Sequence, residues 1–287
     1  MDKDILTLIS RENSGFSKGQ RLIAKYIMEN YDKAAFMTAG RLGKTVGVSE
    51  STVVRFAAEL GFDGYPGMRK ALQEMIRSRL TSVQRIEASR DMLDDGNILK
   101  SVLSDDIEKL QATLEEIDRH SFEQVVDSII AAREIYIFAS RTSRSLADFL
   151  SYYLSLLRAG VHVIDDNSAS GVYEQMLRIG EGDLFIGFTF PRYSSHPGKV
   201  MSFAKSHGAY AVGLTDGENS PFFGLADICL YAKSEMVSFV DSLVAPMSLV
   251  NALIIAVGAR SRGALSETFN KLEQVWREYK VFESSDD

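Results

Sequence analysis

From Glu134 onward, short apolar runs alternate with amphipathic stretches, and this alternation restricts the possible folds more than any other feature of the sequence. The apolar runs, in chain order, are EIYIFA, VHVI, DLFIGFTF, YAVGLT and DICLYA. Runs of this length predict buried strands, whereas the stretches between them have helical spacing and end in glycine. Strands that alternate with helices predict an α/β fold, a Rossmann-like three-layer sandwich whose parallel sheet has helices on both faces.

Two loops of this region combine hydroxyl groups with arginine. They follow the first and third predicted strands, and in such sheets ligands bind at the carboxyl ends of the strands. Hydroxyls, free N–H groups at a helix start and guanidinium groups all favour an anion. The alternative is that Ser and Thr only cap helices. The candidate ligand-binding residues are Ser140, Arg141, Thr142, Ser143 and Arg144 in the first loop, and Thr189, Arg192, Tyr193 and Ser194 in the second.

Residues 1–80 show a different pattern, in which short helices are separated by glycine. Thr38 starts one predicted helix, Gly47 allows a tight turn, and Ser49 is the N-cap of the next helix. This order is typical of a helix-turn-helix, whose second helix enters the major groove of DNA. The alternative is a trihelical bundle that binds protein. The candidate DNA-binding residues are Lys44, Ser49, Glu50, Ser51, Thr52, Arg55, Arg69 and Lys70.

The charge distribution favours DNA over the protein-binding alternative. The chain of 287 residues has a net charge of −7, but residues 17–80 contain 11 Lys and Arg against 6 Asp and Glu, a net charge of +5. A basic segment joined to an acidic body is the electrostatic pattern of a nucleic-acid-binding module.

The single cysteine excludes an internal disulfide framework and a cysteine-based zinc site. The N-terminus is unlike a signal peptide and no apolar run reaches membrane-spanning length, so we expect a cytoplasmic protein with no membrane partner.

The segment TAGRLGKTVGVSESTVVRFAAELGFDGYPGMRKAL resembles the helix-turn-helix domain of the RpiR/MurR family of bacterial transcriptional regulators. The resemblance covers about the first 80 residues and includes the S-x-x-T-V-V-R-F core and the L-G-F-x-G-Y tail. It implies that the chain binds DNA.

Residues 120–260 resemble a sugar isomerase (SIS) domain, the usual effector domain of that family. The resemblance implies that Ser143, Thr189 and Ser194 contact a ligand phosphate. The two loops depart from the family pattern, because Ala139 and Arg141 replace the two glycines of the first loop. In the second loop, Pro191 and Arg192 replace serine and glycine. The added arginines leave open whether the ligand is a phosphosugar, a carboxylate or a more acidic sugar derivative.

These observations predict three regions: a DNA-binding domain over 1–80, a helical linker over 81–119, and an SIS domain with C-terminal helices over 120–287. The composition changes between Ser78 and Asn97, where we place the boundary. We therefore expect a transcriptional regulator whose partners are operator DNA and a small anionic effector, a phosphosugar or sugar acid. The apolar helices predicted near 98–117 and 244–282 pack within the chain or against a second copy, in a homodimer or dimer of dimers.

A sugar-phosphate isomerase is the alternative function, because SIS domains also occur in such enzymes. Isomerisation needs a base near an acidic C–H group, and the nearest candidates are His196, Glu174 and Glu235. A DNA-binding module has no purpose in a purely metabolic enzyme, so we assign no catalytic residue. The sequence also lacks G-x-G-x-x-G and metal-ligand spacing, and we expect no cofactor and no metal.

Overall fold

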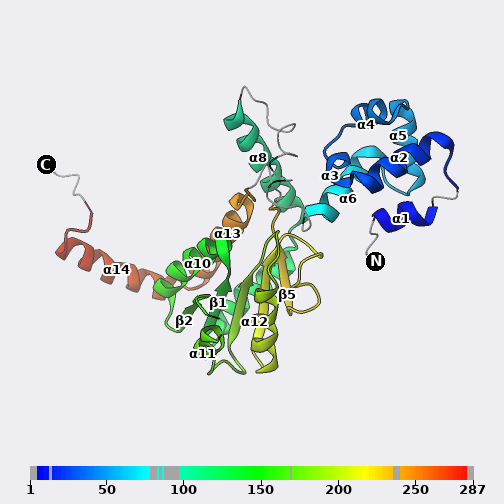
Figure 1. Cartoon of the computed structure of the whole chain (residues 1–287). Coiled ribbons are helices and arrows are strands. Elements are labelled where there is room, and N and C mark those ends of the chain that lie inside the picture. Colours follow the sequence, from blue (N-terminus) through cyan, green and yellow to red (C-terminus); the bar gives the residue numbers. More distant parts are fainter. Residues whose placement is uncertain are drawn as a thin grey trace. The chain divides into compact units, whose positions relative to one another are not determined.

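The computed structural model describes residues 5–12, 15–77, 83, 86, 97–168, 170–234 and 240–282 (Figure 1). The chain divides into two compact units. The first comprises Met1–Leu103 and Met236–Asp241, and the second comprises Ser104–Glu235 and Ser242–Asp287. Most of the stretch from Ser78 to Asn97, where the sequence predicts the domain boundary, lies outside the described residues.

The first unit is helical, and its helices begin and end where local chemistry predicts. Ser17 forms a capping box with Gln20, while Thr38 and Ser49 each accept a hydrogen bond from the backbone N–H three residues on. Apolar side chains from all these helices form one core, centred on Phe16, Ile23, Leu42 and Phe56 among others. The helices are α1 (Ile5–Glu12), α2 (Lys18–Glu29), α3 (Tyr31–Ala34), α4 (Ala39–Val46), α5 (Glu50–Glu59) and α6 (Gly64–Arg77).

The second unit contains a parallel sheet in the order β2-β1-β3-β4-β5. All five predicted strands are confirmed, and the α/β fold class with them. The strands are β1 (Ile135–Ala139), β2 (Val161–Ile164), β3 (Leu184–Phe188), β4 (Tyr210–Thr215) and β5 (Ile228–Tyr231). The helices are α8 (Ile98–Glu116, which begins within the limits of the first unit), α9 (Arg119–Ala131), α10 (Arg144–Leu157), α11 (Gly171–Gln175), α12 (Ser195–Ser206), α13 (Val244–Arg260) and α14 (Arg262–Glu278).

Helices cover both faces of this sheet (Figure 1). Successive side chains of a strand point to opposite faces. Ile137 and Ala139 of β1 therefore pack with α9, α10 and α13, whereas Tyr136 and Phe138 of the same strand pack with α11 and α12. The central strands β1 and β3 are buried at every residue and β4 at all but its first, which explains why they occur in the sequence as continuous apolar runs.

Helix α8 exposes several of the apolar residues that the sequence predicts to pack within the chain or against a second copy. Its apolar residues Ile98, Ile107 and Leu114 are exposed, whereas Lys109 and Thr113 are buried. The Thr113 hydroxyl accepts a hydrogen bond from the Lys233 backbone N–H at 2.9 Å. Helical periodicity therefore located the helix, but it did not predict which side of the helix is covered.

In the described parts of the chain, no single helix is long and apolar enough to cross a membrane. Val244–Arg260 and Leu265–Glu278 satisfy that test only as a pair, and the pair is bent by 104°.

Candidate functional site

The two predicted ligand loops are neighbours at the carboxyl edge of the sheet. β1 pairs with β2 on one side and β3 on the other, and Ala139 at the end of β1 is level with Phe188 of β3. The connection after β1 leads into α10 on one face, and the connection after β3 leads into α12 on the opposite face. The two connections therefore leave the sheet on opposite faces, and β1 and β3 form its topological switch point. In doubly wound sheets, ligands bind in a crevice at this point.

Two buried hydroxyl residues lie at this switch point. Ser143, directly before α10, is 7% exposed, and Thr189, directly after β3, is 3% exposed. Ser143 stands at the N-terminal end of α10, whose dipole favours negative charge.

The arginines of the first loop differ in how they are held. Arg144 forms ion pairs with Asp148 at 2.6 Å and Asp165 at 2.8 Å. These contacts raise the pKa of the Arg144 guanidinium. Arg141 is exposed and has a φ of 58°, in the left-handed region that strongly favours glycine. This backbone conformation of Arg141 is consistent with the family pattern, which has glycine at this position. Thr142, the next residue, is also exposed.

The predicted residues of the second loop are partly engaged within the protein. The Tyr193 hydroxyl donates a hydrogen bond to Asp216 at 2.6 Å. The Ser194 hydroxyl caps α12 by accepting from the His196 backbone N–H at 3.3 Å. Arg192 is exposed at the same edge. At Ser194 the helix-capping alternative is therefore realised in the structure.

Three aspartates at this edge were missed by the sequence argument. Asp165 and Asp166 follow β2, and Asp216 follows β4. Ser140 donates a hydrogen bond from its hydroxyl to Asp166 at 2.6 Å, and His196 pairs with the other oxygen of Asp166 at 2.8 Å. The sequence could have indicated these aspartates, because each directly follows a predicted strand. Every loop that follows a parallel strand lies at the same edge of the sheet, whether its residues are acidic or basic.

In the first unit, α4, Gly47 and α5 form the predicted helix-turn-helix. Gly47 has a φ of 76° and ends α4 in the left-handed conformation. The Ser49 hydroxyl lies 2.8 Å from the hydroxyls of both Ser51 and Thr52 at the start of α5. Arg55 is exposed one turn later, and its Nε donates to the Ser51 carbonyl at 3.4 Å. The face opposite the core thus presents short hydroxyl side chains and one arginine.

The other predicted DNA-binding residues lie in more varied environments. Lys44 on α4 and Lys70 on α6 are exposed. Arg69 is half-buried, and its Nε has no hydrogen-bond partner in the described part of the chain. The Glu50 carboxylate lies against the backbone of α4 at Gly40, so this acid contacts the preceding helix of its own unit.

Gly43 is a further residue of the turn that the sequence argument did not single out. A Cβ atom at this position would lie 2.8 Å from the carbonyl oxygen of Val48. The backbone N–H groups of Gly47 and Val48 both donate to the Gly43 carbonyl. The close approach of α4 to the turn therefore requires glycine at 43 as well as at 47.

Two of the three catalytic candidates of the isomerase alternative lie within the described residues. Glu174 is exposed on α11, His196 pairs with Asp166, and Glu235 lies outside the described residues. In the part of the chain that the structure describes, no group of three His, Cys, Asp or Glu side chains is arranged to hold a metal ion.

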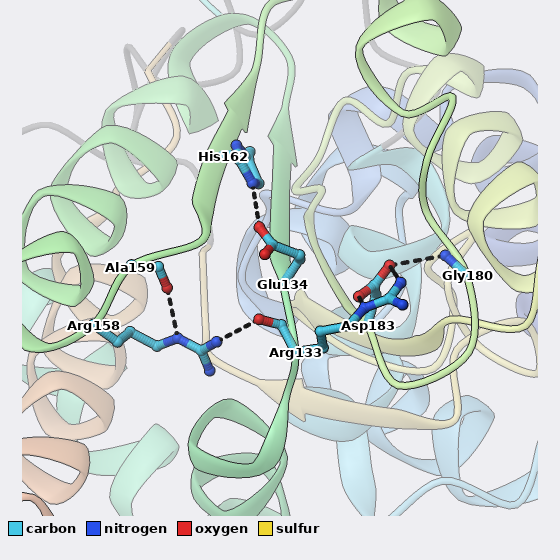
Figure 2. Close-up of polar contacts among 7 residues, drawn as sticks. All are labelled: Arg133, Glu134, Arg158, Ala159, His162, Gly180 and Asp183. Atoms are coloured by element: carbon cyan, nitrogen blue, oxygen red, sulfur yellow. Dashed lines mark hydrogen bonds and ion pairs between the residues drawn. The ribbon is translucent and has the colours of Figure 1, made fainter.

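A cavity of about 360 Å³ lies at the opposite, amino-terminal end of the strands, lined in part by Arg133, Glu134 and Arg158. Arg158 donates hydrogen bonds to the carbonyl oxygens of Ala159 and Arg133 there, and His162 pairs with Glu134 (Figure 2). Arg158 also donates to the Ile129 carbonyl. These polar groups connect the backbone segments that precede β1 and β2, and they are remote in sequence from the predicted ligand loops.

Comparison with known families decides what the two units are. Residues 3–79 match the model of the helix-turn-helix domain of the rpiR family, and residues 128–256 match that of the SIS domain. The chain contains an RpiR-family helix-turn-helix domain followed by an SIS domain. Similar proteins include the HTH-type transcriptional regulator HexR of Pseudomonas aeruginosa, 26% identical over 79% of this chain and 78% of the relative. An uncharacterized HTH-type transcriptional regulator of Haemophilus influenzae is 24% identical over 79% of each chain.

Solved structures share the fold of this chain. The sugar isomerase domain of an RpiR transcription factor from Sphaerobacter thermophilus superimposes with a TM-score of 0.59 and 24% identity, covering 62% of this chain and 99% of that one. The NanR protein of Vibrio vulnificus, solved in complex with ManNAc-6P, gives a TM-score of 0.54 and 22% identity over 95% of this chain and 99% of its own. These likenesses support the helical unit followed by a parallel α/β unit.

Proposed function

We propose that this regulator senses a small anionic metabolite, a phosphosugar or sugar acid, in the crevice between the loops that follow β1 and β3. The observation that carries the proposal is the pair of buried hydroxyl residues, Ser143 and Thr189, which the strand order brings to the same edge of the sheet. Thr142 and Arg141 border the same edge and supply further donors to an anion, whereas the Ser140 hydroxyl there donates to Asp166. The NanR relative was solved with a phosphosugar, which supports this class of ligand.

The first unit binds operator DNA through α5 in this proposal. Its exposed face offers Ser51, Thr52 and Arg55 to base edges, and arginine makes bidentate contacts to guanine. Lys44 and Lys70 contribute phosphate contacts, which position the helix without specifying sequence. The functional division is the one expected from the sequence: DNA binding by 1–80, a helical linker over 81–119 and sensing by 120–287.

Effector binding changes DNA affinity through a second copy of the chain. A homodimer places two recognition helices on successive major-groove faces about 34 Å apart. A ligand that favours one arrangement of the subunits then changes operator affinity, typically by a coupling free energy of about 1–3 kcal/mol.

Thermal unfolding with candidate effectors tests the sensor. Wild type, Ser143→Ala and the control Ser155→Ala, which changes an exposed serine further along α10, are screened against sugar phosphates and sugar acids. At one hundred times its dissociation constant, a ligand stabilises the native state by about 2.7 kcal/mol. We expect this shift in wild type and Ser155→Ala, and a smaller shift in Ser143→Ala. If no anionic sugar stabilises the wild type, or if Ser143→Ala responds equally, the proposed pocket is wrong.

The isomerase alternative has one observation in its favour, the His196–Asp166 pair at the same edge, because a histidine held by a carboxylate is a common form of general base. We propose that the SIS domain acts as a sensor and not as a catalyst. Incubation of the purified protein with aldose and ketose phosphates tests this. If the wild type forms product and His196→Asn does not, the domain is an isomerase and the proposal is wrong.

A further inference from the structure

Asp166 joins three loops of the candidate crevice through its two carboxylate oxygens. Oδ2 accepts a hydrogen bond from the Ser140 hydroxyl at 2.6 Å, and Oδ1 lies 2.8 Å from Nδ1 of His196. Asp166 follows β2, Ser140 follows β1, and His196 lies in the first turn of α12 after β3. One side chain therefore connects the three neighbouring strand ends β2, β1 and β3.

This contact determines which nitrogen of His196 can bind a ligand. An ionised carboxylate can only accept hydrogen bonds, so Nδ1 of His196 is the donor to Asp166, and in the neutral tautomer of this pair Nε2 is an acceptor. The ring also packs edge-on against Phe138 of β1, with centroids 5.4 Å apart and planes at 79°. Its side chain is 26% exposed, so the ring is held on one side and accessible on another. His196 is thus oriented before any ligand arrives.

His196 and Ser143 lie on opposite sides of the switch point. Ser143 precedes α10, which packs on one face of the sheet, and His196 belongs to α12, which packs on the other. The crevice between β1 and β3 therefore has hydroxyl donors on the α10 side and an acceptor on the α12 side. A ligand that reaches both sides needs an anionic group at one end and a hydroxyl at the other.

We infer that His196, positioned by Asp166, is a specificity-determining residue that accepts a hydrogen bond from an effector hydroxyl through Nε2. The inference rests on the proposed function and deepens it: the effector is a polyhydroxylated anion, and its anionic group binds on the Ser143 side. Asp166 is a positioning residue, which acts by fixing the ring and by holding the Ser140 loop. Inorganic phosphate binds only on the Ser143 side, so its affinity does not depend on His196.

Calorimetric titration of the full chain with glucose 6-phosphate, fructose 6-phosphate, 6-phosphogluconate and inorganic phosphate tests the inference. His196→Asn keeps an amide near the position of Nδ1 but removes the acceptor at Nε2, whereas His196→Gln places an amide near Nε2. We expect His196→Asn and Asp166→Asn to weaken the best-bound sugar by about tenfold or more, the effect of losing one buried hydrogen bond. The phosphate affinity of both variants stays within about twofold of the wild-type value. His196→Gln recovers part of the sugar affinity that His196→Asn loses. Asp166→Asn combined with His196→Asn binds no worse than His196→Asn alone.

The outcomes separate the inference from the function on which it rests. Suppose that the wild type binds sugars and that Ser143→Ala lowers their affinity, but that Asp166→Asn and His196→Asn bind sugars as the wild type does. The proposed sensor function is then supported and the inference about His196 is wrong. If phosphate weakens in parallel with the sugars in His196→Asn, the residue is structural and the inference is also wrong. If the wild type binds none of the sugars, both fail. Unfolding of each variant without ligand shows whether its fold is intact.

Discussion

Arg133 holds the buried carboxylate of Asp183 by two parallel hydrogen bonds, 2.9 Å from Nε to Oδ1 and 2.8 Å from Nη2 to Oδ2 (Figure 2). The Gly180 backbone N–H donates to the same carboxylate at 2.9 Å. Arg133 precedes β1 and Asp183 precedes β3, so the pair joins the amino-terminal ends of the two strands whose carboxyl ends border the candidate crevice.

Asp183→Ala is expected to lower the free energy of unfolding of the second unit by about 1–3 kcal/mol, because Gly180 loses the acceptor of its N–H group. Urea denaturation measures this change. Glu181→Ala, which removes an exposed acid from the same turn, is the matched control and is expected to change little. Equal stability of Asp183→Ala and wild type would show that the pair does not stabilise the sheet.

The same pair predicts a pH dependence. Burial by itself raises the pKa of Asp183, but the hydrogen bonds from Arg133 and Gly180 outweigh burial, and the net pKa lies below its ordinary value. A carboxylate with a lowered pKa contributes stability that is complete above its unfolded pKa of about 3.9 and is lost as the pH falls through its folded pKa. The stability difference between wild type and Asp183→Ala is therefore largest near neutral pH and shrinks below about pH 4. A difference that grows on acidification would contradict this assignment.

Two glycine substitutions test the turn of the helix-turn-helix. Gly47→Ala is expected to cost about 1–2 kcal/mol, because alanine is strained at a φ of 76°. Gly43→Ala brings its Cβ against the Val48 carbonyl and is expected to cost at least as much, since backbone must move. Thermal unfolding and DNA binding report both effects. Gly67→Ala on α6, where the nearest atom is 3.9 Å from the new Cβ, is the control and should be neutral or stabilising.

Arg55→Ala and Thr52→Ala are expected to weaken specific DNA binding and leave the fold intact, because Arg55 is exposed on α5 and Thr52 is only half-buried. Loss of a bidentate arginine–guanine contact costs about 1–3 kcal/mol of discrimination. Fluorescence anisotropy on a duplex selected from a random library measures affinity and selectivity. Arg119→Ala removes the same charge from α9 and serves as the control. Unchanged affinity and selectivity in both α5 variants would remove the DNA-reading assignment.

Arg141→Gly is expected to stabilise the second unit by roughly 0.5–1 kcal/mol and to weaken effector binding. The gain arises because the left-handed backbone at a φ of 58° costs a non-glycine residue about 1–2 kcal/mol, part of which is offset by the entropy of glycine in the unfolded chain. Arg141→Lys keeps both the charge and the strain, and it isolates the backbone effect. Calorimetry and ligand titration provide the two measurements. A less stable Arg141→Gly variant would show that the loop tolerates the side chain without strain.

Much of the fold could be predicted from the sequence because its determinants are local. Thr38 and Ser49 cap the helices that they were expected to cap, and Gly47 takes the left-handed conformation that a tight turn requires. The apolar runs after Glu134 became strands because a strand buried on both faces needs apolar residues at successive positions. Hydroxyl-rich loops after two strands were likewise visible in the sequence.

The sequence by itself therefore determined the elements, their order and the family. Only the tertiary structure decided that Asp166 contacts Ser140 and His196, that Arg144 is held by Asp165, and that α8 buries Lys109 while exposing Ile107. These contacts join residues brought together by the strand order β2-β1-β3-β4-β5, or depend on which side of a helix is covered. Strand order is a property of the whole sheet, and no local pattern of residues encodes it. Sequence periodicity separates the two faces of a strand or helix, but it specifies neither which helix face is covered nor which residues become neighbours.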